Sequence, residues 1–309
     1  MSAWLAVFLI PVALFGQAAS AAPAWSGGRP PECGDVARRA GNGWDRAKAP
    51  EVKRYCDLIA SASSKLAGAK LMAQVALSAA FEADRLCPGY AAPRVLQGRA
   101  LLAMGDLPGA LRELTVARSR DARALEDPPA LLAWARVLAR AGHREEAGDA
   151  YRSLLPRASV LSPVNRSSAQ VEAGLVAMHR GEGGLDEAAA ALRDAVREGE
   201  DETRSTAVLA LALALDRGGD SSEARAVLEQ RAAHGDPRVV LASARARELL
   251  EVAPEETCAL SALALEGSDS AGARDEWQKA VVAAAGGPWS AHAKAHLAAL
   301  QRAGRRSTP

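Results

Sequence analysis

Hydrophobic positions in residues 91–122 repeat with the spacing of two helices. A step of three to four residues is that of a helix that buries one face. It is carried here by Leu96, Leu101, Leu102, Leu107, Leu111 and Leu114. Gly105 and Asp106 lie between the two runs, where they favour a turn. The pattern predicts two antiparallel helices joined by a short turn.

Small residues lie where two such helices would cross. Gly98 in the first helix is followed twelve residues later by Ala110 in the second. Ala76 precedes Ala110 by 34 residues, so an earlier hairpin is expected there. Equivalent pairs follow downstream: Ala135 and Ala147, Gly174 and Ala188, and Ala212 and Ala224. The same helical hairpin therefore recurs along most of the chain.

Residues 91–122 resemble a tetratricopeptide repeat in Gly98, Ala110, Leu114 and Ala117. The period of that family is about 34 residues, which is the interval noted above. The family's large aromatic residue is replaced by Leu114 in this copy. The resemblance implies an all-α fold: a right-handed α-solenoid of about five to seven antiparallel hairpins over residues 51–303, with a surface that binds protein.

The composition agrees with close-packed helices. Hydrophobic residues make up 49% of the chain and aromatic residues only 4%, so the apolar side chains are mostly Ala and Leu. Lys and Arg number 38 against 37 Asp and Glu, which gives a formal charge of +1 without a long run of one sign. General nucleic-acid binding is therefore unsupported.

The N-terminus predicts export. Residues 3–15 form an uncharged apolar run, and Ala19-Ser20-Ala21 fits a signal-peptidase site. We expect a signal peptide at residues 1–21, a lead-in with one short helix at residues 22–50 and a disordered tail at residues 304–309. The mature chain would then lack a membrane span and would be periplasmic or extracellular. An uncleaved membrane anchor, or a cytoplasmic regulator whose start is wrongly assigned, are the alternatives.

Four cysteines follow the predicted signal peptide. In an oxidising compartment they could pair. Cys33 and Cys56 enclose a short loop near the end of the array, where a bridge would stabilise by about 3 kcal/mol, and we favour this pair. Cys56 with Cys87 is the rival, because both lie at the open end of one predicted hairpin. Cys258 is expected to be a buried thiol, and a chain without any bridge is the remaining alternative.

Helix pairing beyond Pro237 is ambiguous in the sequence. Four helices are expected, at about residues 238–252, 255–265, 271–284 and 289–303. The spacing of Ser261, Ala273, Trp277 and Ala280 would make the middle two a repeat, with a linker before it and a cap after it. Simple alternation would give two degenerate hairpins instead.

The chain lacks the common catalytic motifs, such as the nucleophile elbow and the phosphate-binding loop. His292 and His296 are spaced i, i+4 and could offer two metal ligands on one helix face. Lys294 stands where a zinc protease needs Glu, and a third ligand is not evident nearby. We therefore expect a solvated helix face, and neither catalytic residues, a cofactor nor a metal.

In tetratricopeptide repeat proteins the first helix of each hairpin lines the concave face, so the resemblance implies a binding groove along these helices. The residue after the small crossing residue is Lys65, Arg99 and Arg136 in three successive units, and it is Leu175 and Leu213 in the next two. Arg140 adds charge one turn beyond Arg136. A partner segment with an acidic end and an apolar end would match this row. The alternative is that the basic side chains are only solvated.

These observations predict a function in binding rather than catalysis. We expect a protein–protein interaction scaffold or assembly factor of the bacterial cell envelope, because a solenoid offers a long concave surface and the Ala, Arg and Gly content suggests a bacterial source. The alternative is an enzyme, or a subunit of one, whose site is dispersed over the helical repeats.

Overall fold

The computed structural model describes residues 30–34, 43–66, 72–231 and 236–306. Within these ranges the regular structure consists of sixteen α-helices and short 3₁₀ turns, without a strand. The all-α prediction is confirmed. The predicted signal peptide and residues 307–309 lie outside the described residues.

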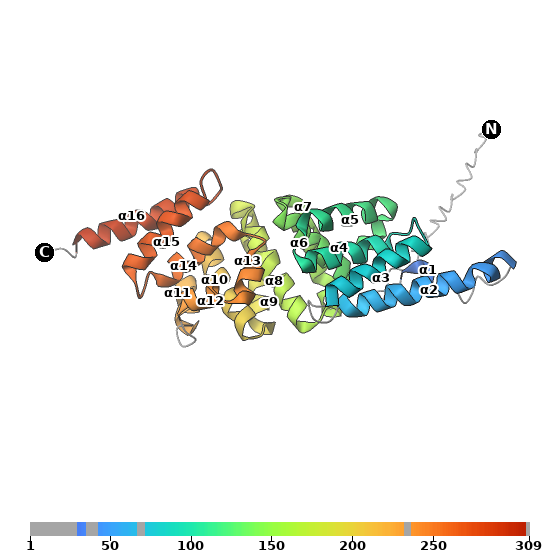
Figure 1. Ribbon diagram of the computed structural model, residues 1–309. Helices are drawn as coiled ribbons and strands as arrows, with labels where there is room; N and C mark the ends of the chain where they lie inside the picture. Colours follow the sequence, from blue (N-terminus) through green and yellow to red (C-terminus); the bar gives the residue numbers. More distant parts are fainter. Residues whose placement is uncertain (1–29, 35–42, 67–71, 232–235, 307–309) are drawn as a thin grey trace, which may run out of the picture.

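Successive helices pack as adjacent antiparallel pairs. In Figure 1 the pairs follow one another in chain order along one long axis, from α2 on the right to α16 on the left. The five pairs before residue 232 are α2 (Gly43–Leu66) with α3 (Ala73–Leu86), α4 (Ala92–Met104) with α5 (Leu107–Arg120), α6 (Pro128–Arg140) with α7 (Arg144–Leu154), α8 (Pro163–Met178) with α9 (Leu185–Glu198), and α10 (Asp201–Arg217) with α11 (Ser221–Arg231).

Three of the hairpin turns share one backbone geometry. Gly105, Gly142 and Gly219 have φ of 89°, 86° and 89°, a left-handed conformation that glycine adopts without strain. Asp106 follows the first of them and caps α5, because its side chain accepts a hydrogen bond from the Gly109 N–H. The Gly-containing turns predicted from the sequence therefore end one helix and start the next.

Glycine at the helix crossings is required by close packing. A Cβ on Gly98 would lie 2.5 Å from Leu114 Cγ, and a Cβ on Gly174 would lie 2.5 Å from Leu192 Cγ. The small residues of the second helices are also buried: Ala76, Ala110, Ala147, Ala188 and Ala224. Packing of these hairpins thus follows the small-residue pattern in the sequence.

The chain beyond Pro237 departs from regular hairpins. The expected helix at residues 238–252 is two short helices, α12 (Pro237–Leu241) and α13 (Ala244–Leu250), because Ser243 between them caps α13. The turn η6 (Pro254–Glu256) leads to α14 (Thr257–Leu265), which pairs with α15 (Ser270–Ala283). This pairing is the repeat that the spacing of small residues allowed. The final helix, α16 (Ser290–Arg306), packs on α15.

Two predicted boundaries are wrong. Helix α2 begins at Gly43 and continues through Pro50, so the predicted boundary between the lead-in at residues 22–50 and the array from residue 51 falls inside one helix. The proline removes one backbone hydrogen bond from this helix. Helix α16 continues to Arg306, so the residues from Gly304 to Arg306 are helical and not part of a tail.

A disulfide joins Cys33 in α1 (Pro31–Gly34) to Cys56 in α2, as predicted. Cys87 and Cys258 are free thiols, so the rival pairing of Cys56 with Cys87 does not form. Beside the bridge the Tyr55 hydroxyl donates a hydrogen bond to Glu32 at 2.7 Å. The helix α1 is therefore fastened to the first hairpin by one covalent bond and one hydrogen bond.

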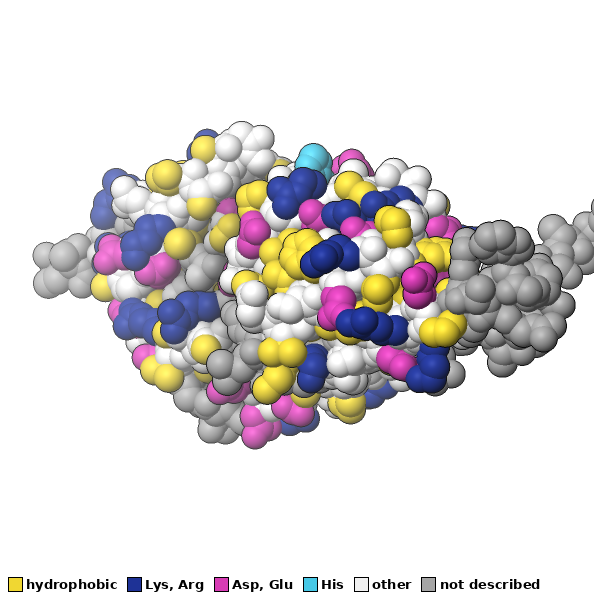
Figure 2. All heavy atoms as spheres, turned by 45° about the vertical axis from the view of Figure 1, so that its right-hand side comes forward, with side chains coloured by type: hydrophobic (Ala, Val, Ile, Leu, Met, Phe, Trp, Pro, Cys, Tyr) yellow, Lys and Arg dark blue, Asp and Glu magenta, His cyan; other side chains and the backbone are white. Residues whose placement is uncertain are grey.

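The molecular surface is mixed in charge. Figure 2 shows one face on which Lys and Arg side chains alternate with Asp and Glu, and the apolar areas between them are small. Among the described helices we find none that combines the length and the apolar character needed to cross a bilayer.

Candidate binding site

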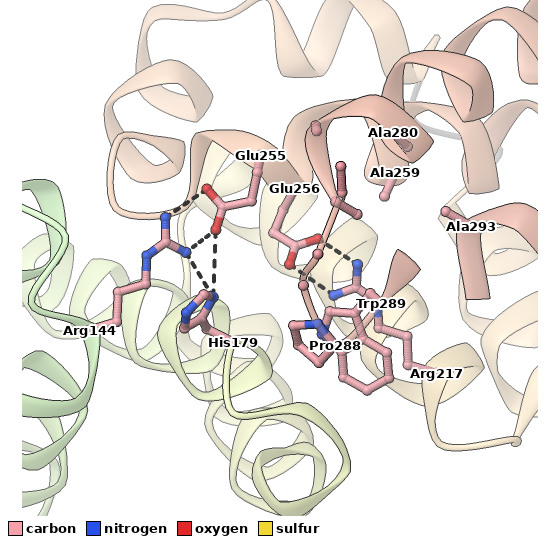
Figure 3. A pocket seen from close by; sticks show the side chains of 15 residues that line it. Arg144, His179, Arg217, Glu255, Glu256, Ala259, Ala280, Pro288, Trp289 and Ala293 are labelled. Atoms are coloured by element: carbon pink, nitrogen blue, oxygen red, sulfur yellow. Dashed lines mark hydrogen bonds and ion pairs between the residues drawn. The ribbon is translucent and has the colours of Figure 1, made fainter. Parts of the chain in front are cut away.

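Several helix ends converge on a cavity of about 390 Å³ in the C-terminal half of the molecule (Figure 3). Arg144 opens α7, His179 follows α8 and Arg217 closes α10. Glu255 and Glu256 come from η6. A cation at the C-terminal end of α10 is placed favourably with respect to the helix dipole.

Trp289 forms one wall of this cavity, just before α16. Its indole N–H donates to the backbone carbonyl of Met178 at 2.7 Å, which fixes the ring against the end of α8. The guanidinium of Arg217 lies 4.6 Å from the ring centroid, within range of a cation–π contact. The tryptophan therefore joins residues that are far apart in the sequence.

The charged groups around the cavity are paired with one another. Arg217 binds Glu256 through two hydrogen bonds of 2.9 and 2.6 Å, and both side chains are almost completely buried. Arg144 binds Glu255 and also donates to His179 Nδ1 at 3.2 Å (Figure 3). Burial, and secondarily the charge of Arg144, lower the pKa of His179, which favours the neutral ring that can accept this hydrogen bond. A ligand in the cavity would therefore have to bind charged groups that are already paired with one another.

The segment 237–256, which comprises α12, α13 and η6, is named the strap here because it crosses the first helices of the hairpins. Helix α13 packs on α8 and α10, and α12 packs on α10 (Figure 1). Arg245 of the strap donates to Ser168 of α8 and, at 3.3 Å, to Thr203 of α10. The strap thus packs across the first helices of the fourth and fifth pairs.

Opposite charges hold the C-terminal end of the strap. Glu251 lies 2.6 Å from Arg140 of α6. Glu255 and Glu256 pair with the two arginines of the cavity, as described above. Between these contacts the apolar side chains of the strap are buried: Leu249, Leu250, Val252 and Ala253. The C-terminal end of the strap is therefore held both by its carboxylates and by its buried apolar side chains.

The predicted groove row does not form an open surface. Leu175 and Leu213 are both 0% exposed, so they belong to the core and cannot present an apolar patch to a partner. The strap packs on their helices, α8 and α10. The prediction that these two leucines line a groove is wrong for this reason.

The cations of the predicted row have separate surroundings. Arg136 is bound by the fully buried carboxylate of Glu172 at 2.9 Å, and Tyr151 donates to the same carboxylate at 3.1 Å. Arg140 pairs with Glu251 of the strap, whereas Arg99 is half-buried near Asp127. Lys65 lies in the last turn of α2 and is also half-buried. Of the four, Arg140 forms a direct ion pair with the strap, and the charge of Glu248 in the strap also acts on Arg136.

A second polar cluster lies beside the cavity, between α10 and α16. The carboxylate oxygen Oδ2 of Asp216 is 2.9 Å from Nε2 of His292 and 2.9 Å from Nε2 of His296. Glu266 accepts from Nδ1 of His296 at 2.7 Å, and Ser221 donates to Asp216 at 2.8 Å. The two histidines are mostly buried, so the expectation of a solvated helix face is wrong.

This cluster affects the protonation of its members. Although burial opposes the charged form, hydrogen bonds to Asp216 and Glu266 raise the pKa of His296 to about 9. Burial acts to raise the pKa of Asp216, but the hydrogen bonds from His292, His296 and Ser221 hold it well below its usual range. Two imidazoles and a carboxylate within 4.8 Å of one another are also a donor set for a metal ion.

Sequence reasoning missed several residues of these sites. Asp216 lies 76 residues from His292, and Arg144 lies 111 residues from Glu255, so short-range motifs do not connect them. One signal was present: residues 207–215 of α10, AVLALALAL, are apolar on every side. A helix without a polar face is covered on all sides, which indicates that another part of the chain lies on α10.

Comparison with known proteins does not extend this description. Neither the models of protein families nor the curated protein sequences contain a match to the chain.

Proposed function

We propose that the protein is a non-catalytic interaction scaffold or assembly factor of the bacterial cell envelope, which binds a segment of a partner protein on the inner face of α6, α8 and α10. The observation that carries the proposal is the strap, since it occupies this face through both ion pairs and buried leucines. A face that accommodates such a segment from its own chain has the shape and charge to accept one from another protein.

The partner segment would resemble the strap in its chemistry. It would carry acidic residues that reach Arg140 and Arg144, and leucines that fill the places of Leu249 and Leu250. Arg–carboxylate pairs favour such a segment and steer its approach, with a strong dependence on salt. The partner would replace the strap, whose pair between Arg140 and Glu251 is partly exposed and therefore weak.

The proposal also includes the arrangement of the helix pairs and the location of the protein. The adjacent helix pairs would form a right-handed, tetratricopeptide-like solenoid whose first helices line the inner face. Export is supported by the bridge between Cys33 and Cys56, because disulfides persist in oxidising compartments, and by the apolar segment at residues 3–15. Fractionation of cells, with blotting of each fraction, tests the location.

The experiment is a titration with a labelled peptide that contains residues 244–256, ARARELLEVAPEE. The double variant Glu251→Gln and Glu255→Gln loosens the strap but keeps the buried pair of Arg217 with Glu256. We expect this variant to bind the peptide at least about tenfold more tightly than the natural chain, which is a change of about 1.4 kcal/mol. Fluorescence anisotropy measures it.

The controls separate specific binding from charge attraction. A scrambled peptide should bind weakly, and Glu276→Gln, which removes a carboxylate from a surface pair with Lys279 on α15, should leave peptide affinity unchanged. Equal binding of the scrambled peptide, or no gain in the loosened variant, would overturn the proposed site. If the chain binds no protein but turns over a cell-wall or small-molecule substrate, the alternative of an enzyme on a helical platform replaces the proposal.

A further inference from the structure

We propose that Asp216, His292 and His296 bind a divalent transition-metal ion, with Zn²⁺ as the ion to test first, and that this ion fastens α16 to the end of α10. This inference rests on the geometry of the cluster and is independent of the proposed interaction function. It assigns the two histidines of α16, which are one helical turn apart, a role that packing alone does not require.

The candidate ligand atoms lie within 4.8 Å of one another. The Nε2 atoms of both histidines lie 2.9 Å from the same oxygen of Asp216. In a tetrahedral site each ligand atom lies about 2.0–2.1 Å from the ion, which places the ligand atoms roughly 3.3 Å from one another. Each histidine nitrogen would therefore have to move about half an ångström away from the Asp216 oxygen to admit an ion. Binding of the ion would displace the proton on Nε2 of His296 into solvent. The resulting two neutral imidazoles and one carboxylate suit Zn²⁺ and its neighbours in the first transition row.

Groups around the cluster hold the donors in orientation. Glu266, just after α14, accepts a hydrogen bond from Nδ1 of His296 and is itself bound by the indole N–H of Trp277 at 2.6 Å. Histidines that bind metals commonly donate their second N–H to a carboxylate in this way. The Trp277 ring is stacked on His296 at a centroid distance of 4.6 Å. Ser221 binds the other oxygen of Asp216 and leaves Oδ2 for the ion.

The arrangement would leave a fourth position for water or another ligand. Three protein ligands with an open position are typical of zinc sites that exchange ligands, whereas structural sites usually supply four. The ligands come from α10 and α16. We expect the ion to act as a clamp on α16, whose packing within the described part of the chain is mainly on α15.

The test uses the full mature chain after removal of metal with a chelator. Titration with ZnCl₂ in a calorimeter should show one ion per chain, and Co²⁺ in its place should give the intense visible absorption of a tetrahedral site. Hydrogen exchange in α16 should slow on addition of Zn²⁺. The double variant His292→Gln and His296→Gln should lose all three responses, and Glu266→Gln should weaken binding by about 10- to 100-fold.

The control is His143→Gln, since His143 is an exposed histidine before α7 and lies outside the cluster. This variant should bind Zn²⁺ as the natural chain does. If the natural chain binds no Zn²⁺, or if the double variant binds it with unchanged affinity, the cluster is a hydrogen-bonded ion network only and the proposal is wrong. Circular dichroism of each variant identifies a folding defect. If the double variant does not fold, the Co²⁺ spectrum of the natural chain decides: tetrahedral absorption supports the site, and its absence contradicts the proposal.

Discussion

The regular hairpins and the strap are attached to the same helices by different means. Within the hairpins, side chains interlock around Gly98 and Gly174. Between hairpins, the charged pair of Arg136 with Glu172 is buried. The strap also buries leucines, but its ion pair with Arg140 is half exposed. Because exposed pairs contribute little and buried ones strongly resist loss of a partner, the hairpins should be fixed. The strap should open more readily at Glu251 than at Glu256, whose pair with Arg217 is almost completely buried.

The largest expected effect comes from the buried pair in the hairpins. Glu172→Gln removes the carboxylate that neutralises Arg136 and accepts from Tyr151. A buried cation would lose its partner, so we expect a loss of about 3–5 kcal/mol in the free energy of unfolding. Urea unfolding followed by circular dichroism measures it. A loss below 1 kcal/mol would remove the distinction between hairpins and strap.

The disulfide is a third means of attachment, by a covalent bond. The variant Cys33→Ser with Cys56→Ser frees α1 from α2 and should cost about 3 kcal/mol, since the bridge closes a loop between residues 23 apart. Non-reducing peptide mapping of the natural protein should recover the linked peptide. The free thiol Cys87 provides the control, because Cys87→Ser should change stability much less. Four alkylatable thiols in the natural protein would contradict this attachment.

Close packing at a helix crossing gives a smaller effect. Gly98→Ala places a Cβ 2.5 Å from Leu114, and the overpacking should cost about 1–3 kcal/mol. The matched control is Gly183→Ala, because a Cβ at Gly183 meets nothing within 4 Å. Thermal unfolding compares the two. Equal melting temperatures would show that the hairpins are not closely packed at this glycine.

The smallest effect on stability is expected at the edge of the strap. Glu251→Gln removes the partner of Arg140 from a pair whose carboxylate is 53% exposed, so the free energy of unfolding should fall by about 0–1 kcal/mol. Hydrogen exchange in residues 244–256 should nevertheless become faster, because the strap opens locally more often. The same substitution at Glu172 serves as the comparison. A stability loss as large as that of Glu172→Gln would show that the strap is as fixed as the hairpins.

Local patterns predicted the hairpins well. The spacing of Gly98 and Ala110 and the glycine turns act within about 34 residues, and the structure places them at crossings and turns. The pairing of α14 with α15 could be anticipated from Ser261 and Ala273 in the same way. The bridge between Cys33 and Cys56 was also predictable, because its loop is short.

The sites could not be predicted in this way, because their contacts join distant parts of the chain. Arg144 meets Glu255, and Asp216 meets His292, only after α12 to α16 have folded back on the earlier helices. The predicted groove assumed that the inner face is open. Leu175 and Leu213 are buried, and the strap packs on their helices, but periodicity within one helix does not reveal which segments lie against it.

The central claim is that the face under the strap is the binding face, and hydrogen exchange with mass spectrometry tests it most directly. The loosened variant, Glu251→Gln with Glu255→Gln, is saturated with a heavy-isotope-labelled peptide of residues 244–256. We predict faster exchange in the protein's own residues 244–256, as the peptide displaces them, with unchanged exchange in α4 and α5. Bound peptide with unchanged exchange in residues 244–256 would contradict the account.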